Sequence, residues 1–342
     1  MSLDRTSKSG FSWTKTPRPM VALAPMAGVT DASYRQFIKK ICPETILYSE
    51  FLSTDAISYG AKKTMGMMEF NPAIEQPFIV QIFGDEPEHF LTAAKVVEQM
   101  GADGIDINMG CPAAKVVSSC HGAALIKSPE LAAELVHATC KAVSIPVSVK
   151  TRLGWDKKDG LINFCRGLVD AGASSLAIHG RRYCDKFTGE ADWEPIYKLK
   201  EAFPHIPVLG NGDIKSGADA LAKLKNLDGV MVGRATFGNP WVMADIVESF
   251  KTGIAQTPTN GQLSFSQKVP YILEHCRLSV EVKGPVRGVR EMRRHLCGYV
   301  KGFDGAAEIR AQLMTTDDPE AVMEIVRKTG EKLKAETTLA AA

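Results

Sequence analysis

Cys111 stands in the most distinctive chemical setting of this 342-residue sequence. It follows the apolar run Gly104-Ile-Asp-Ile-Asn-Met-Gly110 and precedes Pro112, so it ends a predicted strand in a glycine–proline turn. Such a turn aims Asn108 and Cys111 into a pocket. A loop thiol near a lysine or a histidine could act as an acid or a nucleophile, whereas most lone cysteines are inert buried groups.

Polar or ionisable side chains end most of the other apolar runs as well. Lys150 follows Val147-Ser-Val149, a run expected inside the wall of the fold. A lysine there can hold a negative charge on a ring, as reduced flavin would need, and the alternative is a surface lysine paired with an acid. The residues predicted to gather at one mouth are Met26, Gln81, Asn108, Cys111, Lys150, Arg152, His179, Asn211 and Arg234.

Two glycine turns, Asn211-Gly212-Asp213 and Gly233-Arg234, end the seventh and eighth predicted strands. Barrel folds commonly bind a phosphate at this place, because glycines let backbone N–H groups approach the ligand and the next helix adds its positive end. An arginine adds a bidentate partner. The alternative is a pair of ordinary tight turns.

These residues need a frame in which the ends of many strands meet. Apolar runs alternate with amphipathic segments of helical length. Eight predicted strands in succession, all but the second followed by a predicted helix, indicate a (β/α)8 TIM barrel. An open doubly wound sheet is the structural alternative. Strands are expected at 21–28, 45–50, 78–84, 104–111, 147–154, 175–180, 208–213 and 229–235, and helices at 31–40, 86–100, 129–143, 161–171, 193–203, 217–225 and 240–250.

The pattern changes after the barrel to helices alone. A polar segment with proline and glycine separates the two regions, and helices are expected at 265–282, 286–301 and 319–334. We therefore predict an N-terminal extension at 1–20, a barrel at 21–250, a linker at 251–261, a small all-helical C-terminal domain at 262–335 and a disordered tail at 336–342.

The predicted helical domain is locally basic. Arg287, Arg290, Arg293 and Arg294 fall on one face of a helix, and only Glu281 and Glu291 oppose the positive charges of this stretch. A basic face beside a catalytic mouth suits a nucleic-acid phosphate backbone. A solvated charged face is the alternative, so the charge pattern leaves both open.

Composition sets further limits. The net charge is +2, and no apolar run approaches the ~20 residues that span a bilayer, so no membrane partner is expected. The start of the chain lacks the apolar core of a signal peptide. Eight cysteines without a CxxC pair indicate neither a zinc ribbon nor a disulfide framework, and the spacing of Cys120 and His121 matches no common metal pattern. We expect a monomeric, metal-free cytoplasmic protein.

Several motifs together resemble the tRNA-dihydrouridine synthases, and the bacterial B-type branch most closely. The resemblance runs from about Val21 to Arg310, and the cysteine motif with the Lys-x-Arg strand is its most specific part. The motifs are Ala24-Pro-Met-Ala-Gly-Val-Thr-Asp31, Asn108-Met-Gly-Cys-Pro112, Val149-Lys-Thr-Arg-Leu-Gly-Trp-Asp156, Ile178-His-Gly-Arg181, Gly189-Glu-Ala-Asp-Trp193, Gly210-Asn-Gly-Asp-Ile214, Val232-Gly-Arg-Ala235 and Glu291-Met-Arg-Arg-His-Leu296.

The resemblance implies bound FMN, NADPH as the hydride source, and reduction of uridine in tRNA. Hydride would pass to C6 of uracil while Cys111 donates a proton to C5, and Asn108 and Arg152 would position the base. The helical domain, with Arg287, Arg290, Arg293 and Arg294, would grip the tRNA. Pro25, Met26 and Ala27 would lie along the flavin, Gln81, Lys150 and His179 at its ring, and Asn211, Gly212, Asp213, Gly233 and Arg234 at its phosphate.

The chain departs from the family's usual pattern in two loops. Arg182 stands where threonine is common, Ala114 where a basic residue is frequent, and Cys120-His121 replaces a polar–glycine turn. These loops bear on target choice and leave the chemistry intact. Two other functions compete: a flavoenzyme acting on a free pyrimidine, like dihydroorotate dehydrogenase, and a non-catalytic tRNA-binding protein.

Overall fold

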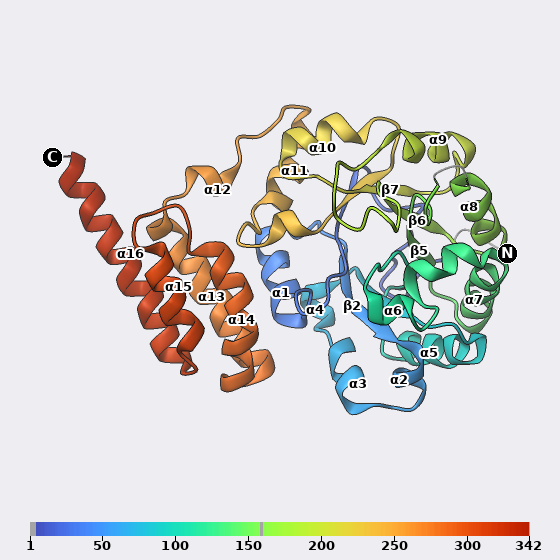
Figure 1. The fold of residues 1–342 in the computed structure, drawn as a ribbon, viewed down its shortest axis with the longest axis horizontal. Coiled ribbons are helices and arrows are strands. Elements are labelled where there is room, and N and C mark those ends of the chain that lie inside the picture. Colours follow the sequence, from blue (N-terminus) through green and yellow to red (C-terminus); the bar gives the residue numbers. More distant parts are fainter. Residues whose placement is uncertain (1–4, 158–159, 342) are drawn as a thin grey trace.

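The computed structural model describes residues 5–157 and 160–341. Eight parallel strands form one sheet in the order β1-β8-β7-β6-β5-β4-β3-β2. Backbone hydrogen bonds between Ile46 and both Val21 and Leu23 join the two edges, so the sheet closes into the predicted barrel (Figure 1). The strands are β1 (Met20–Leu23), β2 (Leu47–Ser53), β3 (Phe78–Phe83), β4 (Gly104–Met109), β5 (Val147–Arg152), β6 (Ser175–His179), β7 (Val208–Asn211) and β8 (Gly229–Val232).

Amphipathic helices cover the outside of the barrel, as their apolar spacing predicts. In α5, Phe90, Ala94 and Val97 share the buried face. Ser216 caps α10 by accepting a hydrogen bond from the backbone N–H of Asp219. The outer helices are α1 (Ala32–Ile41), α5 (Pro87–Gln99), α7 (Pro129–Ala142), α8 (Leu161–Asp170), α9 (Glu194–Ala202), α10 (Gly217–Leu224) and α11 (Val242–Thr252).

Several short helices interrupt the regular alternation and were not predicted. Each spans two turns or less, which is too short for a 3.6-residue period to stand out in a sequence. They are α2 (Thr54–Ser58), α3 (Lys62–Met68), α4 (Pro72–Glu75), α6 (Ala114–Val117), and the 3₁₀ segments η1 (Gly122–Lys127) and η2 (Arg234–Thr236).

The N-terminal segment contributes to the interior of the barrel. Phe11 and Trp13 are buried and lie edge to face, 5.0 Å apart, in one apolar cluster with Met20, Ile79 and other inward-facing strand residues. Met20 and Ile79 stand near the starts of their strands, so the two aromatic rings close the end of the barrel where the strands begin. The predicted N-terminal extension therefore contributes two aromatic side chains to the core, although most of its other residues are at least partly exposed.

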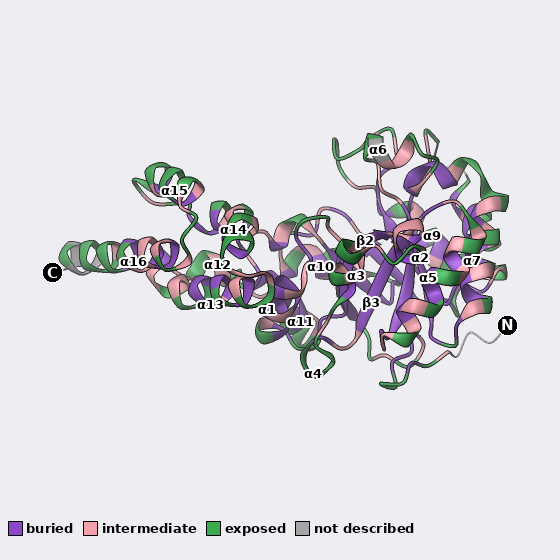
Figure 2. Ribbon diagram, turned by 90° about the horizontal axis from the view of Figure 1, so that it is seen from below, coloured by how far each residue is buried: buried purple, intermediate pink, exposed green. Residues whose placement is uncertain are grey.

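The helical domain extends from one side of the barrel (Figures 1 and 2). It comprises α12 (Thr259–Gln262), α13 (Phe265–Lys283), α14 (Pro285–Tyr299), α15 (Ala306–Thr315) and α16 (Pro319–Ala341). Helix α15 was not predicted. Helix α16 continues to Ala341, through residues for which a disordered tail was predicted.

The helical domain is attached through α1, the first helix of the barrel. Lys283 of α13 forms an ion pair of 2.6 Å with Asp31, the N-cap of α1. Tyr34 packs on His295 with ring centroids 4.4 Å apart, and Phe37 stacks on His275 at 4.7 Å. This buried aromatic interface fixes the domain beside the loop that follows β1. No helix within the described ranges is long and apolar enough to cross a membrane.

Candidate active site

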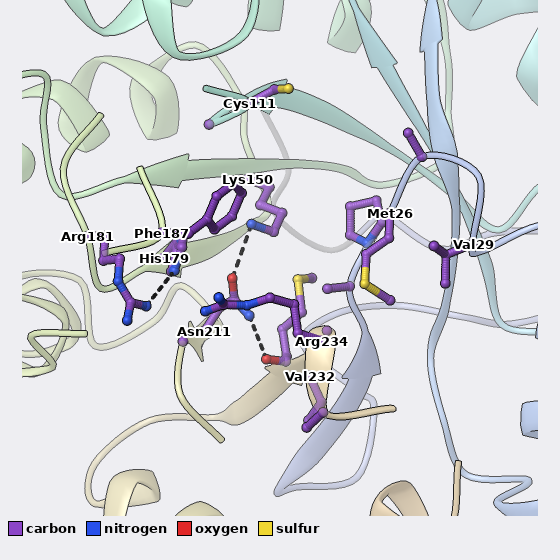
Figure 3. Close-up of a pocket in the computed structure, with 18 of the residues that line it drawn as sticks. Met26, Val29, Cys111, Lys150, His179, Arg181, Phe187, Asn211, Val232 and Arg234 are labelled. Carbon is purple, nitrogen blue, oxygen red and sulfur yellow. Dashed lines mark hydrogen bonds between the residues drawn. The ribbon is translucent and has the colours of Figure 1, made fainter. Parts of the chain in front are cut away.

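A cavity of about 850 Å³ opens at the carboxyl ends of the strands (Figure 3). Every strand contributes to its lining, either from its last residues or from the loop that follows, as expected for the functional face of this fold. The residues predicted to hold the cofactor all line it: Pro25, Met26, Ala27, Gln81, Lys150, His179, Asn211, Gly212, Asp213, Gly233 and Arg234. Cys111, Asn108, Arg152 and Arg294 line it as well.

The loop that carries Cys111 is held by hydrogen bonds from two sides. The Asn108 side-chain oxygen accepts the backbone N–H groups of Gly110 at 3.1 Å and Cys111 at 2.9 Å. On the other side, the guanidinium of Arg152 donates to the Gly110 carbonyl at 2.7 Å. Burial raises the pKa of the Cys111 thiol above its ordinary value of 9.0. The thiol therefore keeps its proton at neutral pH, which suits an acid better than a nucleophile.

Lys150 is the cation at the centre of the cavity. Its ammonium group donates to the side-chain oxygen of Asn211 at 3.3 Å, and Asn211 donates in turn to the Met231 carbonyl at 2.8 Å (Figure 3). Burial and the nearby charge of Arg152 lower the pKa of Lys150 to about 8. A partly desolvated ammonium group of this kind gains from a negative charge brought next to it.

His179 is neutral. Burial and the surrounding cations, Lys150 foremost, lower its pKa to about 2. Arg181 lies 3.3 Å from the Nε2 atom of His179 (Figure 3). Because a guanidinium only donates, Nε2 accepts and the ring proton is on Nδ1. Sequence reasoning gave Arg181 no role in the site, since only its place in a motif marked it.

The side chain of Asp213 is occupied by the protein itself. Its carboxylate pairs with Arg181 at 2.7 Å and accepts the backbone N–H of Ala191 at 2.7 Å. A carboxylate also repels a phosphate, so Asp213 can serve an anion only through its backbone and by holding Arg181 in place. Arg234 is the more available cation here, because it is 57% exposed and lies 3.5 Å from Asp213.

Arg152 is also bound to the protein. It is almost fully buried, and besides Gly110 it donates to the carbonyls of Arg182 at 3.0 Å and Lys186 at 2.8 Å. Arg152 thus braces the cysteine loop against the loop after β6. That second loop presents Phe187, a ring 54% exposed that lines the cavity and lies 5.4 Å from the Arg152 guanidinium. No spacing rule marked Phe187 in the sequence.

The four arginines of α14 divide into two groups. Arg294 lines the cavity and donates to the carbonyls of Ala27 at 3.1 Å and Gly28 at 3.2 Å. Arg290 and Arg293 each pair with Asp317 at 2.8 Å, while Arg287 pairs with Glu291 at 2.7 Å. Arg287, Arg290 and Arg293 are not part of the cavity lining. Arg287 and Arg290, each more than half exposed, remain accessible to a large partner.

His121 holds the far end of the cysteine loop. Its Nε2 atom lies 2.9 Å from a carboxylate oxygen of Asp85, in the loop after β3. Cys120 is exposed. In the part of the chain that the structure describes, no three His, Cys, Asp or Glu side chains are grouped to hold a metal ion.

Comparisons with known proteins place the chain in a family. The profile of the family described as dihydrouridine synthase (Dus) matches residues 22–337. A probable tRNA-dihydrouridine synthase 1 of Synechocystis sp. is 39% identical over 299 residues, which cover 86% of this chain and 81% of the relative. A tRNA-dihydrouridine synthase B of Pseudomonas putida is 37% identical over 316 residues, 91% of both chains.

Solved structures agree at the level of the fold. A 2-naphthoyl-CoA reductase in complex with 2-naphthoyl-CoA superposes with a TM-score of 0.53 and 11% identity, over 67% of this chain and 50% of the other. At this level of identity the likeness concerns the fold alone. With a family profile that spans nearly its whole length and relatives that align across it, the chain belongs to the dihydrouridine synthase family.

Proposed function

We propose that this enzyme reduces the C5=C6 bond of specific uridines in tRNA to 5,6-dihydrouridine, with FMN as its bound cofactor and NADPH as the hydride source. The relatives described above are named for the first part of this reaction. The observation that carries the proposal is that Cys111, Asn108 and the predicted flavin-contacting residues line one cavity at the carboxyl ends of the strands.

The chemistry of the cavity fits FMN. Pro25, Met26 and Ala27 offer an apolar wall, and Lys150 offers a cation for negative charge on a reduced ring. Gly212, with a φ of 123°, and Gly233 present bare backbone to the cavity near Arg234. A phosphate favours this combination of backbone N–H groups and an available guanidinium.

Bound and reduced FMN supplies the hydride that C6 of uracil receives. Cys111 supplies the proton for C5, because its buried thiol remains protonated at neutral pH. The side-chain oxygen of Asn108 accepts hydrogen bonds from the cysteine loop, and its amide nitrogen donates one hydrogen to the side-chain oxygen of Gln81 at 2.8 Å. The second amide hydrogen of Asn108 is then available to a carbonyl of the base.

The helical domain provides the surface for tRNA. Arg287 and Arg290 are exposed on α14, while Arg294 of the same helix reaches the rim of the cavity. One helix therefore spans the distance from an exposed basic surface to the reaction site. A base that leaves its stack to enter the cavity would keep its flanking phosphates near these arginines.

The proposal is tested by nucleoside mass spectrometry on unmodified tRNA incubated with the purified protein, FMN and NADPH. We expect a gain of two hydrogens on uridine, at positions that fragment mapping then identifies. No gain, although the flavin is bound and NADPH reduces it, would contradict the proposal. In that case reduction of free uracil or oxidation of dihydroorotate would indicate a small-pyrimidine enzyme instead.

A further inference from the structure

Below the cavity lies a buried carboxylate that neither the sequence motifs nor the proposed reaction uses. Asp106 is the third residue of β4, and its side chain is fully buried inside the barrel. The strand register pairs it with Gln81 of β3 on one side and Ser148 of β5 on the other. Asn108 stands two residues further along β4, on the same face and nearer the mouth. Asp106 does not line the cavity.

A chain of hydrogen bonds leads from Asp106 to the cysteine loop. The Gln81 amide nitrogen donates to Asp106 at 2.7 Å, and the Asn108 amide nitrogen donates to the Gln81 oxygen at 2.8 Å. The Asn108 oxygen then accepts the N–H groups of Gly110 and Cys111. The other carboxylate oxygen of Asp106 accepts the Ser148 hydroxyl at 2.7 Å, outside this chain.

The chemistry at the two ends fixes the direction of the chain. Burial raises the pKa of Asp106 to about 6, so at neutral pH its carboxylate is ionised for the most part and only accepts hydrogen bonds. Gln81 must then turn its NH₂ group toward Asp106. Its oxygen then faces Asn108, whose own oxygen is left for the loop. The backbone N–H groups of Gly110 and Cys111 require the same orientation of Asn108, because they only donate and therefore need its side-chain oxygen. Without an acceptor at position 106, nothing at that end holds the Gln81 NH₂ group, so the Gln81 amide can turn over. A reversed Gln81 would present NH₂ to the NH₂ group of Asn108, and Asn108 would lose the hydrogen bond that holds it on the side away from the loop.

We infer that Asp106 is a positioning residue for the proposed reaction: through Gln81 and Asn108 it sets the orientation of the loop that carries Cys111. This inference rests on the proposed function, in which Cys111 donates the proton to C5. Asp106 acts without touching substrate or cofactor, and the buried chain transmits its effect over two side chains.

The inference is tested with Asp106→Leu and Asp106→Asn, measured as full-length flavin-loaded proteins. Leucine removes the acceptor, so the single-turnover rate with reduced flavin and tRNA should fall by about 10²-fold, as for a misplaced catalytic group. Reduction of the flavin by NADPH should change by less than about threefold. Asparagine can still accept from Gln81 and donate to Ser148, so it should restore the rate to within about tenfold of wild type.

Ser148→Ala is the matched control, because it removes the other hydrogen bond to the same carboxylate and leaves the chain to Cys111 intact. It should keep the wild-type single-turnover rate. If Asp106→Leu does not fold, Asp106→Ser replaces it, since a serine hydroxyl is too short to reach Gln81. Equal slowing of both half-reactions, or equal slowing in Asp106→Leu and Ser148→Ala, would show a purely structural role and overturn the inference.

A second readout needs no tRNA activity. Alkylation of Cys111 by iodoacetamide, followed by peptide mapping, reports the loop directly, with the exposed Cys297 of α14 as an internal reference. Asp106→Leu should change the Cys111 rate at least about threefold, with Cys297 unaffected and Asp106→Asn like wild type. An unchanged Cys111 rate would overturn the inference. A wild-type enzyme inactive on tRNA would instead contradict the proposed function and leave this readout valid.

Discussion

At the scale of single residues, burial decides what each group can do. The pKa of the Cys111 thiol is raised, whereas the pKa of Lys150 is lowered to about 8 and that of His179 to about 2. One cavity therefore holds a protonated thiol, a poised cation and a neutral imidazole at neutral pH. Burial in surroundings of low polarity favours the uncharged form of every titratable group. In this cavity it keeps the thiol protonated and the imidazole neutral, and it brings the pKa of the ammonium group close to neutral pH.

Replacement of Cys111 by alanine should separate chemistry from cofactor binding. We expect flavin content to stay at the wild-type level while the single-turnover rate with tRNA falls by ~10²–10⁴, the loss typical of a positioned acid. Rapid-mixing absorbance of the flavin measures the rate. Cys165→Ala, at a buried thiol of the outer helix α8 that does not line the cavity, is the control and should react at the wild-type rate. Loss of flavin from Cys111→Ala would mean that the cysteine is structural.

From the sequence, residues of the candidate site could be identified only where they lie at the end of a predicted strand. Cys111, Lys150 and Asn211 follow apolar runs, and the barrel brings such residues to one mouth. The partners of Arg152 and Asp213 are backbone groups or side chains from distant loops. No spacing encodes those contacts, so the sequence predicted both residues as ligand contacts and did not predict that their side chains also hold the surrounding loops.

At the scale of elements, α14 combines two tasks on one helix. Its buried face carries Met292, His295 and Leu296 against the rest of the fold, and its exposed face carries Arg287 and Arg290. The helical period predicted this division. The ion pairs with Asp317 were not predictable, because they depend on the turn after the unpredicted α15.

Arg287→Ala combined with Arg290→Ala should weaken tRNA binding without unfolding the domain. Since each lost phosphate contact removes about one unit from the slope of log Kd against log salt, the slope should become shallower by up to about two. Binding is measured by filter retention at several salt concentrations. Lys95→Ala with Lys141→Ala, on the outer helices α5 and α7, is the matched control for two lost charges. An unchanged slope would exclude this face of α14 from the RNA surface.

The interface between α1 and the helical domain should weaken in acid. Burial lowers the pKa of His295 in the folded protein to about 4, although the charge of Asp31 opposes the shift. In the unfolded chain the same histidine is protonated near its ordinary pKa of 6.5. The free energy of unfolding is therefore unaffected by His295 above about pH 6.5 and decreases as the pH falls from there toward 4.

Urea unfolding measured between pH 7 and 4.5 tests this effect. Wild type should lose on the order of 2 kcal/mol more than His295→Phe over that range. His137→Gln, at an exposed histidine, should follow wild type. Parallel curves for wild type and His295→Phe would mean that His295 does not limit acid stability.

At the scale of the whole molecule, counting repeated units was enough to predict the barrel. Eight alternations of strand and helix close on themselves, and the later change to helices alone marks the second domain. The count of strand–helix units does not predict the segments that lie outside the repeat. The short helices between β2 and β3 and the N-terminal closure of the barrel arise from tertiary packing, which a local pattern does not record.

Trp13→Ala should reveal the contribution of that closure. Trp13 is almost fully buried, so its loss should lower the free energy of unfolding by about 3–5 kcal/mol. Flavin content per folded molecule should not change, because the residue is not part of the cavity lining. Chemical denaturation measures the first quantity and flavin absorbance the second. Trp13→Phe should lose much less, and an unaltered stability of Trp13→Ala would show that the barrel needs no N-terminal closure.

The bracing by Arg152 also bears on how this active site can diverge. Its guanidinium donates hydrogen bonds to the main-chain carbonyls of Gly110, Arg182 and Lys186. Every residue type carries that carbonyl, so mutations can replace the side chains of the loop after β6 while its anchorage persists. The departures from the usual family pattern at Arg182 and the residues after it fall in this loop. Selection can therefore vary the surface offered to RNA there while the position of Cys111, the proposed proton donor, is inherited unchanged.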